Sequence, residues 1–173
     1  MPSKKAVHVQ HPPTYSLLGV RMTIHLSGAQ TGGEFSIIGA TMPPGGDGGL
    51  HMHTHEDESL CMLEGELEVT IGEETLVRRS GESYFAPRNI AHRLRNRGKA
   101  TARALLINTP GTFDQFVRAA GVSVDTQTSP SGPPDSVQIQ RLLDIASEFG
   151  VTILAPPELT SGAAPKEECR RQA

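Results

Sequence analysis

Several residue types are scarce in this chain, and each scarcity excludes a class of protein. Only two cysteines occur, Cys61 in an expected strand and Cys169 in a polar tail, so we expect no disulfide framework. No apolar run approaches the ~20 residues of a membrane span, and the N-terminus lacks the apolar core of a signal peptide. The simplest compartment is therefore the cytoplasm, with no membrane partner. Tryptophan is absent and aromatic residues make up 4%, so we expect an aliphatic core.

Positive charge is also in short supply. Sixteen Lys and Arg residues face 19 Asp and Glu residues, giving a formal net charge of −3 and a pI near 6.2. No strongly basic face is implied, which argues against a nucleic-acid partner. The Arg-rich run 88–99 is the exception, and its alternating positions are typical of a strand surface. At 173 residues the chain suits one domain with a sizeable core and is short for two.

Glycine and proline are plentiful by contrast, with 18 and 13 residues, and they divide much of the chain into short segments. Between these turn residues the sequence predicts strands at 15–26, 34–42, 60–63, 66–71, 75–79, 83–86, 91–96 and 101–109. Many short strands separated by turns favour an antiparallel sandwich or barrel. The expected fold class is therefore all-β.

The apolar pattern changes to a helical period after the last of these strands. Thr112 is expected to open a capping box with Gln115, in a helix that ends at Gly121. Asp135 is expected to cap a second helix, and residues 151–154 could add an edge strand. The expected organisation is an N-terminal arm (1–14), a β-barrel (15–110), a C-terminal helical extension (111–157) and a polar, disordered tail (158–173).

The clearest chemical signal is a group of histidines and acids that follows a Gly-rich loop. The group consists of His51, His53, His55, Glu56, Asp57 and Glu58. In an extended strand side chains alternate between faces, so His51 and His53 point the same way, about 7 Å apart along the chain. An unbroken strand would aim Glu58 at the opposite face, so a turn or bulge through residues 54–57 must bring it back. The alternative is a solvated, charged hairpin.

A second stretch, 81–96, holds the next candidate ligand. His92 follows a proline turn there, although a lone histidine is a weak candidate by itself. Together the two stretches resemble the cupin superfamily, whose motifs read G-x5-H-x-H-x(3,4)-E-x6-G and G-x5-P-x-G-x2-H-x3-N. The matching positions are Gly45, His51, His53, Glu58, Gly65, Gly81, Pro87, His92 and Asn96. Asn89 stands where the family has glycine, a mild departure because asparagine tolerates a positive φ.

The resemblance implies a fold and a metal site. The fold would be a cupin barrel, a double-stranded β-helix or jelly roll, with C-terminal helices. One divalent transition metal would lie inside the barrel, with His51, His53, Glu58 and His92 as its ligands. Three imidazoles and one carboxylate leave coordination positions open, and iron, nickel, manganese, cobalt, copper and zinc all accept such a set. The sequence does not select among these metals.

The other members of the histidine and acid cluster each have two interpretations. His55 shares the parity of His53 and competes with it, but the motif spacing leaves His55 in the turn. Glu56 and Asp57 are interpreted as surface turn residues. The alternative is that these two acids hydrogen-bond the imidazoles of the metal ligands.

Strand alternation also predicts which side chains line a pocket. If Glu58 faces inward, Leu60 and Met62 do as well, and Cys61 faces outward. The candidate pocket residues are Phe35, Ile37, Leu60, Met62, Tyr84 and Leu94. For each apolar residue among them, plain barrel core is the alternative. A pocket of this kind is mostly aliphatic and suits a flat or apolar small molecule.

The resemblance is strongest to small single-domain cupins similar to quercetin (flavonol) 2,3-dioxygenase. The segments that carry it are 43–45 (P-P-G), 56–67 and 109–113. It implies a metal-dependent dioxygenase that oxidises or cleaves an enolisable aromatic or flavonol-like molecule with O2, and Glu58 would be both ligand and catalytic base. Two alternatives stay open. One is a non-redox, metal-dependent cyclase or isomerase of the polyketide type, and the other is a non-catalytic cupin that binds a small molecule.

The resemblance also implies a homodimer. The expected strand 15–26 and its preceding arm could complete the sheet of a partner, because an exposed strand edge offers unpaired backbone groups.

Overall fold

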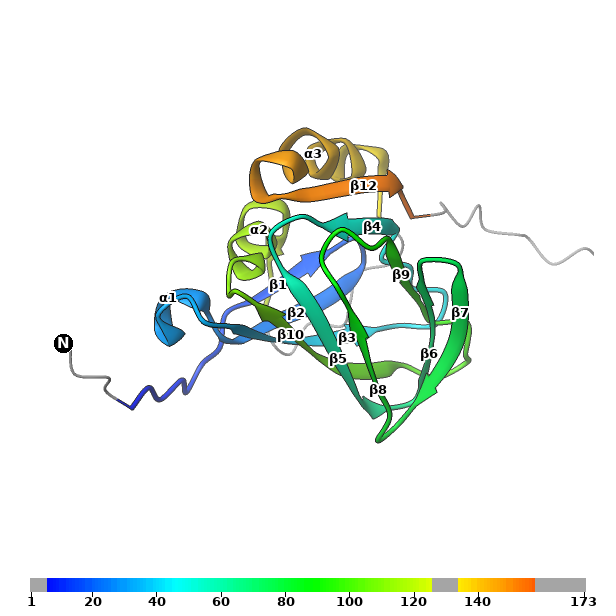
Figure 1. Ribbon diagram of the computed structural model, residues 1–173, viewed down its shortest axis with the longest axis horizontal. Coiled ribbons are helices and arrows are strands. Elements are labelled where there is room, and N and C mark those ends of the chain that lie inside the picture. The colour runs from blue at the N-terminus through cyan, green and yellow to red at the C-terminus, as the bar shows by residue number, and fades with distance from the viewer. Residues whose placement is uncertain (1–5, 126–133, 158–173) are drawn as a thin grey trace, which may run out of the picture.

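A computed structural model describes residues 6–125 and 134–157, which form two antiparallel sheets and a group of helices at one end (Figure 1). The larger sheet has the order β11-β1-β2-β3-β10-β5-β8, and the smaller has the order β12-β4-β9-β6-β7. The strands of the larger sheet are β1 (Thr14–Leu17), β2 (Val20–Leu26), β3 (Ser36–Met42), β5 (Asp57–Glu64), β8 (Ser83–Ala86), β10 (Ala102–Thr109) and β11 (Val122–Ser123). Those of the smaller sheet are β4 (Leu50–His53), β6 (Glu66–Ile71), β7 (Glu74–Arg79), β9 (His92–Arg95) and β12 (Val151–Ala155). This arrangement confirms the expected all-β jelly-roll barrel.

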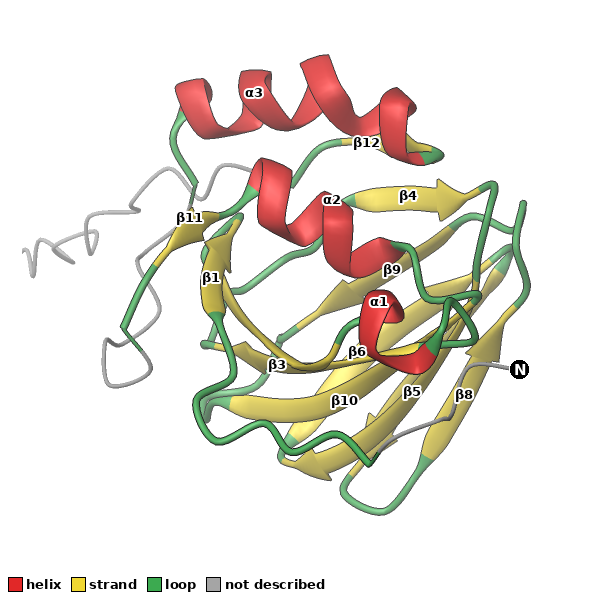
Figure 2. Cartoon of the chain, turned by 90° about the vertical axis from the view of Figure 1, so that its left-hand side faces the viewer, coloured by secondary structure: helices red, strands yellow, loops and turns green. Residues whose placement is uncertain are grey.

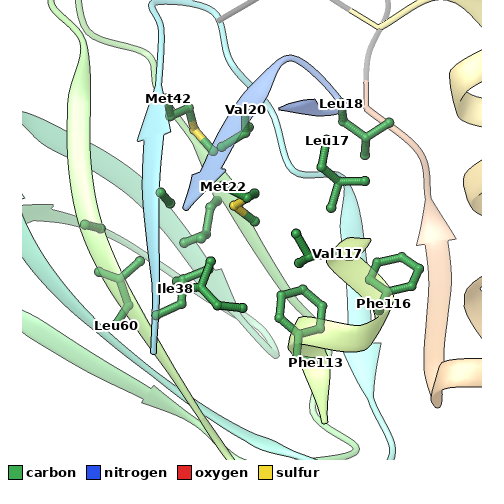
Figure 3. Packing of buried hydrophobic residues seen from close by; sticks show 14 of the residues in the cluster. Leu17, Leu18, Val20, Met22, Ile38, Met42, Leu60, Phe113, Phe116 and Val117 are labelled. Atoms are coloured by element: carbon green, nitrogen blue, oxygen red, sulfur yellow. The ribbon is translucent and has the colours of Figure 1, made fainter. Parts of the chain in front are cut away.

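Strand alternation places the apolar side chains between the two sheets. Along β5 the inner positions Glu58, Leu60 and Met62 are buried, whereas Cys61 lies on the outer side, as alternation predicts. The core is aliphatic apart from a few aromatic rings at the helical end, where Met22, Met42, Phe113 and Phe116 gather (Figure 3). The composition therefore predicted the character of the core correctly.

The predicted strand 15–26 is in fact a hairpin of β1 and β2. Leu18 and Gly19 form its two-residue turn, with φ angles of 52° and 77°. A tight hairpin of this type requires two positive φ angles. Gly19 suits one of them, but leucine rarely adopts the other, so Leu18-Gly19 is a weak turn signal. The short strand β11 pairs with Tyr15 and Ser16 of β1 and so covers part of the edge on which the homodimer argument relies, and the homodimer stays a prediction.

The C-terminal elements follow the prediction closely. They are α2 (Phe113–Ala120), α3 (Ser136–Ala146) and the 3-10 turn η1 (Ser147–Phe149), in addition to the short α1 (Gly28–Thr31) earlier in the chain. Asp135 caps α3 by accepting a hydrogen bond from the backbone nitrogen of Gln138. The predicted capping box of Thr112 is wrong, because the Thr112 side chain makes no hydrogen bond to its own helix.

The helices lie over one end of the barrel, as Figure 2 shows, with α2 nearer the strands and α3 outside it. The strand β12 joins the smaller sheet beside β4, where Val151 pairs with His53 and Ile153 pairs with His51. The helical extension is thereby attached to the strand that carries two candidate ligands. No helix in residues 6–125 or 134–157 is long and apolar enough to cross a membrane. The expected tail 158–173 lies outside the described residues, and the proposed domain boundaries stay predictions.

Candidate metal centre

Three of the predicted ligands converge from two paired strands. On β4 and β9, His51 lies directly opposite His92. One ring nitrogen from each of His51, His53 and His92 lies within 4.8 Å of the others. The turn between β4 and β5 returns Glu58 to the same side, as expected. Its Oε2 lies 3.6 Å from His53 Nε2 and its Oε1 lies 3.7 Å from His92 Nε2.

The hydrogen bonds of the imidazoles leave their metal-binding nitrogens free. The Nδ1 atoms of His51 and His92 lie 3.0 Å and 3.1 Å from the carbonyl oxygens of Gly49 and Ile90. A carbonyl only accepts, so each Nδ1 carries the hydrogen and each Nε2 keeps its lone pair. Among the described residues the buried Nε2 atoms of His53 and His92 have no hydrogen-bond partner. A divalent first-row metal bound to these nitrogens would satisfy them, so the donor set fits the metal that the sequence predicts.

Glu58 is held in place by two neutral donors. The Tyr84 hydroxyl donates to Oε1 at 2.6 Å, and Asn108 Nδ2 donates to Oε2 at 3.2 Å. Tyr84, predicted as a pocket residue, therefore holds the carboxylate instead. Asn108 was missed by the sequence analysis, although it is an amide at an inward position of an apolar strand. This inward position in the strand was the one sequence feature that could have identified Asn108.

The electrostatics of the site lower the pKa values of Glu58, His51 and His92, which favours an ionised carboxylate and neutral His51 and His92. Burial raises the pKa of Glu58, but the charges of His92, His53 and His51 and the Tyr84 hydrogen bond outweigh it and lower this pKa to about 2. Burial and the neighbouring His92 and His53 lower the pKa of His51 to about 3. Burial and the Glu58 charge raise the pKa of Tyr84 well above 10.0, so its hydroxyl stays a donor. Neutral imidazoles beside a carboxylate are the protonation states that metal binding requires.

The loop before β4 is fixed by Asp47. Its Oδ1 accepts hydrogen bonds from the Gly49 backbone nitrogen and from Arg93 Nε, both at 2.9 Å. Gly49 in turn accepts from His51, so the chain of contacts runs from β9 through the loop to a ligand. On the other side, Asn89 has the positive φ of 64° that the motif position demands, and its backbone nitrogen donates to the His53 carbonyl.

The other members of the cluster lie outside the centre, with one correction. His55 is exposed in the turn, as predicted, and Asp57 forms a two-pronged ion pair with Arg88. Glu56, expected at the surface, is 1% exposed. Its Oε2 lies 3.4 Å from His53 Nδ1, so the alternative interpretation, a carboxylate beside a ligand imidazole, describes Glu56 better. The sequence could not predict this burial because it depends on α2.

A cavity of about 60 Å³ adjoins the centre. Its walls are Leu17, Leu18, Val20, Met22, Ala40, Met42, Gly48, His51, Glu58, Leu94, Leu106, Phe113, Phe116, Leu142, Val151 and Ile153. Among these described residues only His51 and Glu58 have polar side chains. Figure 3 shows Phe113 and Phe116 of α2 facing Met22 and Leu17 across this end of the barrel.

The cavity departs from the predicted pocket in several places. Leu94 lines it as predicted, whereas Leu60 and Met62 are buried in the barrel core away from it. Phe35 and Ile37 do not line this cavity. Phe35 lies just before β3, and Ile37 lies half-buried on the outer face, because the inner positions of β3 are those of even number. The sequence analysis did not predict that α2, α3 and β12 contribute to the cavity wall. The spacing of apolar residues indicates that a helix has an apolar face, but it does not indicate what that face packs against.

The comparisons with known proteins place this centre in a family. The family described as Cupin domain matches residues 40–108. The polyketide synthase CurC of Streptomyces cyaneus is 34% identical over 107 residues, which cover 59% of this chain and 70% of CurC. The chain belongs to the cupin family. The metal ligands of this cupin, like the quercetinase-like specificity, stay predictions.

Two further similarities have a narrower meaning. The xanthan biosynthesis protein XanB of Xanthomonas campestris pv. campestris is 38% identical over 68 residues, which cover 39% of this chain. The cupin chain spans only 15% of the length of XanB. A predicted oxalate decarboxylase of Thermotoga maritima superposes with a TM-score of 0.55 at 23% identity, covering 61% of this chain and 99% of that one. This last likeness shows the fold alone.

Proposed function

We propose that this cupin is a metal-dependent enzyme that acts on an apolar small molecule with an acidic, enolisable carbonyl group. The observation that carries the proposal is the cavity wall, whose polar side chains are the two predicted ligands His51 and Glu58. A sugar or a small dicarboxylic acid would leave hydroxyl or carboxylate groups unpaired against this wall, at a cost of about 1–3 kcal/mol for each hydroxyl and more for each carboxylate. A substrate whose polar atoms all gather at the metal avoids that cost.

The residues of the centre have different roles in the proposed proton transfer. A divalent cation held by His51, His53 and His92 would act as a Lewis acid on a carbonyl oxygen of the substrate. Glu58 is the group placed to accept the proton that the substrate loses, and Tyr84 and Asn108 fix its orientation. Although burial raises the pKa of Glu58, the neighbouring imidazoles and the Tyr84 hydrogen bond lower it below its ordinary value, so this carboxylate is a weak base. We therefore expect substrates with an already acidic proton, such as 1,3-dicarbonyl compounds and hydroxy-enones.

A non-redox isomerisation or cyclisation of a polyketide-like compound is the function that the site supports best. Such a reaction needs only proton removal and return, which Glu58 can perform, and the apolar wall excludes competing water. The similarity to a protein named polyketide synthase supports this substrate class. The metal-binding nitrogens of His53 and His92, buried and unpartnered among the described residues, favour an enzyme over a binding-only cupin.

The dioxygenase predicted from the sequence is the second candidate. It would share the proton transfer to Glu58, after which O2 attacks the activated substrate. The apolar cavity supports it, because O2 is an apolar molecule and three imidazoles with one carboxylate leave positions open. Flavonol and a polyketide-like compound both need more room than about 60 Å³, since drug-sized ligands occupy pockets of ~300–1,000 Å³, so cavity size does not separate the two candidates. A substrate of that size would have to displace part of the helical wall.

The test uses the protein purified without added metal. Metal content is measured first, with His51→Ala and His92→Ala as controls. Deuterium exchange at the central carbon of 1-phenyl-1,3-butanedione is then followed by NMR, together with O2 consumption. We expect about one metal per chain and exchange above the buffer rate, lost in Glu58→Gln at equal metal content. Exchange without O2 uptake identifies the non-redox enzyme, and O2 uptake coupled to turnover identifies the dioxygenase. Full exchange activity in Glu58→Gln, or a metal-free wild type, would overturn the proposal.

A further inference from the structure

Glu56 is a buried acid that neither the motif nor the proposed reaction uses. It stands in the turn between β4 and β5, within a run of charged residues, yet it is 1% exposed. Its Oε2 has no hydrogen-bond partner among the described residues and lies 3.4 Å from His53 Nδ1. The Nδ1 of His53 is likewise buried and without a hydrogen-bond partner in the described part of the chain. Two such atoms at this distance are each other's natural partners, because buried polar groups are rarely left unpaired.

The second carboxylate oxygen of Glu56 contacts the start of α2. Thr112 donates its hydroxyl to Glu56 Oε1. Thr112 is the N-cap residue of α2, where a threonine hydroxyl ordinarily accepts from the backbone of its own helix. Here the hydroxyl makes no such bond. The capping interaction is given up for the contact with Glu56, and the carboxylate also benefits from the positive end of the helix dipole.

The residue after Thr112 contacts the same imidazole. The ring of Phe113 meets His53 edge-on, with ring centroids 4.7 Å apart and an interplanar angle of 77°. Phe113 is 5% exposed and also lines the cavity, as Phe116 does one turn later in α2. The start of α2 therefore reaches His53 by two routes. Phe113 contacts the imidazole directly, and Thr112 reaches it through Glu56.

We propose that Glu56 is a positioning residue that couples the ligand His53 to α2. Its carboxylate accepts the Nδ1 hydrogen of His53, which leaves Nε2 free to bind the metal. Through its contact with Thr112, Glu56 also holds α2 over the cavity. This inference rests on the proposed metal centre. Coupling is reciprocal, so metal binding at His53 and the closed position of α2 stabilise each other. The same contacts set the height of the Phe113 and Phe116 wall above the metal, and hence the size of substrate that enters.

The experiment compares Glu56→Gln and Thr112→Val with two matched surface variants, Glu64→Gln and Thr101→Val. The probe is Co²⁺ alone, titrated into metal-free protein while its visible spectrum is recorded. Hydrogen exchange of the α2 amides is measured by mass spectrometry with and without Co²⁺. For Glu56→Gln we expect a 10–100-fold loss of Co²⁺ affinity, the usual effect of removing a partner of a ligand imidazole, and a changed spectrum. In the wild type we expect Co²⁺ to slow exchange in α2, and in both variants we expect this slowing to be lost.

The outcomes separate this inference from the metal centre on which it rests. Wild-type protein that binds Co²⁺, with Glu56→Gln equal in affinity, spectrum and α2 exchange, overturns the coupling and leaves the centre intact. His51→Ala and His92→Ala variants that bind Co²⁺ as the wild type does overturn the centre itself. If Glu56→Gln fails to fold, Thr112→Val decides alone, because an unchanged effect of Co²⁺ on α2 exchange in that variant refutes the coupling.

Discussion

Hydrogen bonds to a single carboxylate matter most at the scale of residues. Glu58 is 2% exposed and receives one bond from Tyr84 and one from Asn108. A buried carboxylate without donors is strongly unfavourable, so these two neutral groups allow an ionised acid to exist in an apolar barrel. They also fix the orientation of the carboxylate, with Oε2 near His53 and Oε1 near His92.

Removal of the Tyr84 hydroxyl tests this role. We expect Tyr84→Phe to lower the free energy of unfolding of the metal-free protein by about 1–3 kcal/mol, because a buried acceptor loses its donor. The measurement is urea denaturation after chelation. Tyr15→Phe is the matched control, since the Tyr15 hydroxyl only accepts a bond from Arg118 in an exposed setting. Equal losses in the two variants would show that the bond to Glu58 contributes little.

The lowered pKa values predict that metal-free protein is sensitive to acid. In the unfolded chain His51 takes up a proton below its ordinary pKa of 6.5, whereas in the folded chain it does so only near 3. The pKa of Glu58 is likewise lower in the folded chain, at about 2, than its ordinary value of 4.5 in the unfolded chain. The unfolded state therefore binds more protons in this range, and stability falls as the pH falls from 6.5. From pH 6.5 to 5 we expect His51 alone to remove about 2 kcal/mol.

Urea denaturation of metal-free protein at pH 7, 6 and 5 measures this loss. His51→Gln, which cannot be protonated, is expected to show a shallower dependence on pH. A wild type that is equally stable at pH 7 and pH 5 would contradict the prediction.

The sequence predicted most elements because turn residues mark their ends. The predicted strands 66–71 and 83–86 coincide with β6 and β8, and glycine or proline residues flank them. The missed β1–β2 hairpin turns at Leu18 and Gly19, and leucine rarely adopts the positive φ angle that this turn needs. The lost cap of Thr112 has a similar origin, because its partner Glu56 lies more than fifty residues away. Motif spacing identified the four candidate ligands, which the structure brings close together. The groups that contact them, Asn108 and Glu56, depend on packing between distant segments.

Packing of α2 against the barrel predicts a large difference between two phenylalanines. Phe116 is 3% exposed and packs near Phe113 and Phe149, whereas Phe85 on β8 is 57% exposed. We expect Phe116→Ala to cost about 3–5 kcal/mol of unfolding free energy, and Phe85→Ala to stay within about 0.5 kcal/mol of the wild type. Urea denaturation at pH 7 measures both. A loss at Phe116 no larger than that at Phe85 would mean that α2 is not part of the core.

At the scale of the whole molecule, the homodimer stays a prediction, although β11 covers part of the strand edge on which its sequence argument relies. The outer face of the larger sheet offers another surface, where Ile37 pairs with Ile107 across neighbouring strands. We expect a mass of two chains by light scattering coupled to size exclusion. Ile107→Lys is then expected to give single chains that keep their Co²⁺ affinity. A wild type that elutes as a single chain at micromolar concentration would refute the homodimer.

The strand β4, which carries His51 and His53, makes four pairs with β12 and one with β9. During synthesis these histidines leave the ribosome about 100 residues before their principal strand partner does. At ~5–20 residues per second this interval lasts roughly 5–20 s. The nascent chain therefore carries the candidate ligands before β12 can hold them in place, so we expect the proposed metal to bind only at the last step of maturation. A chain interrupted between β10 and β12 would keep most of the barrel strands and lose the strand that holds the candidate ligands His51 and His53.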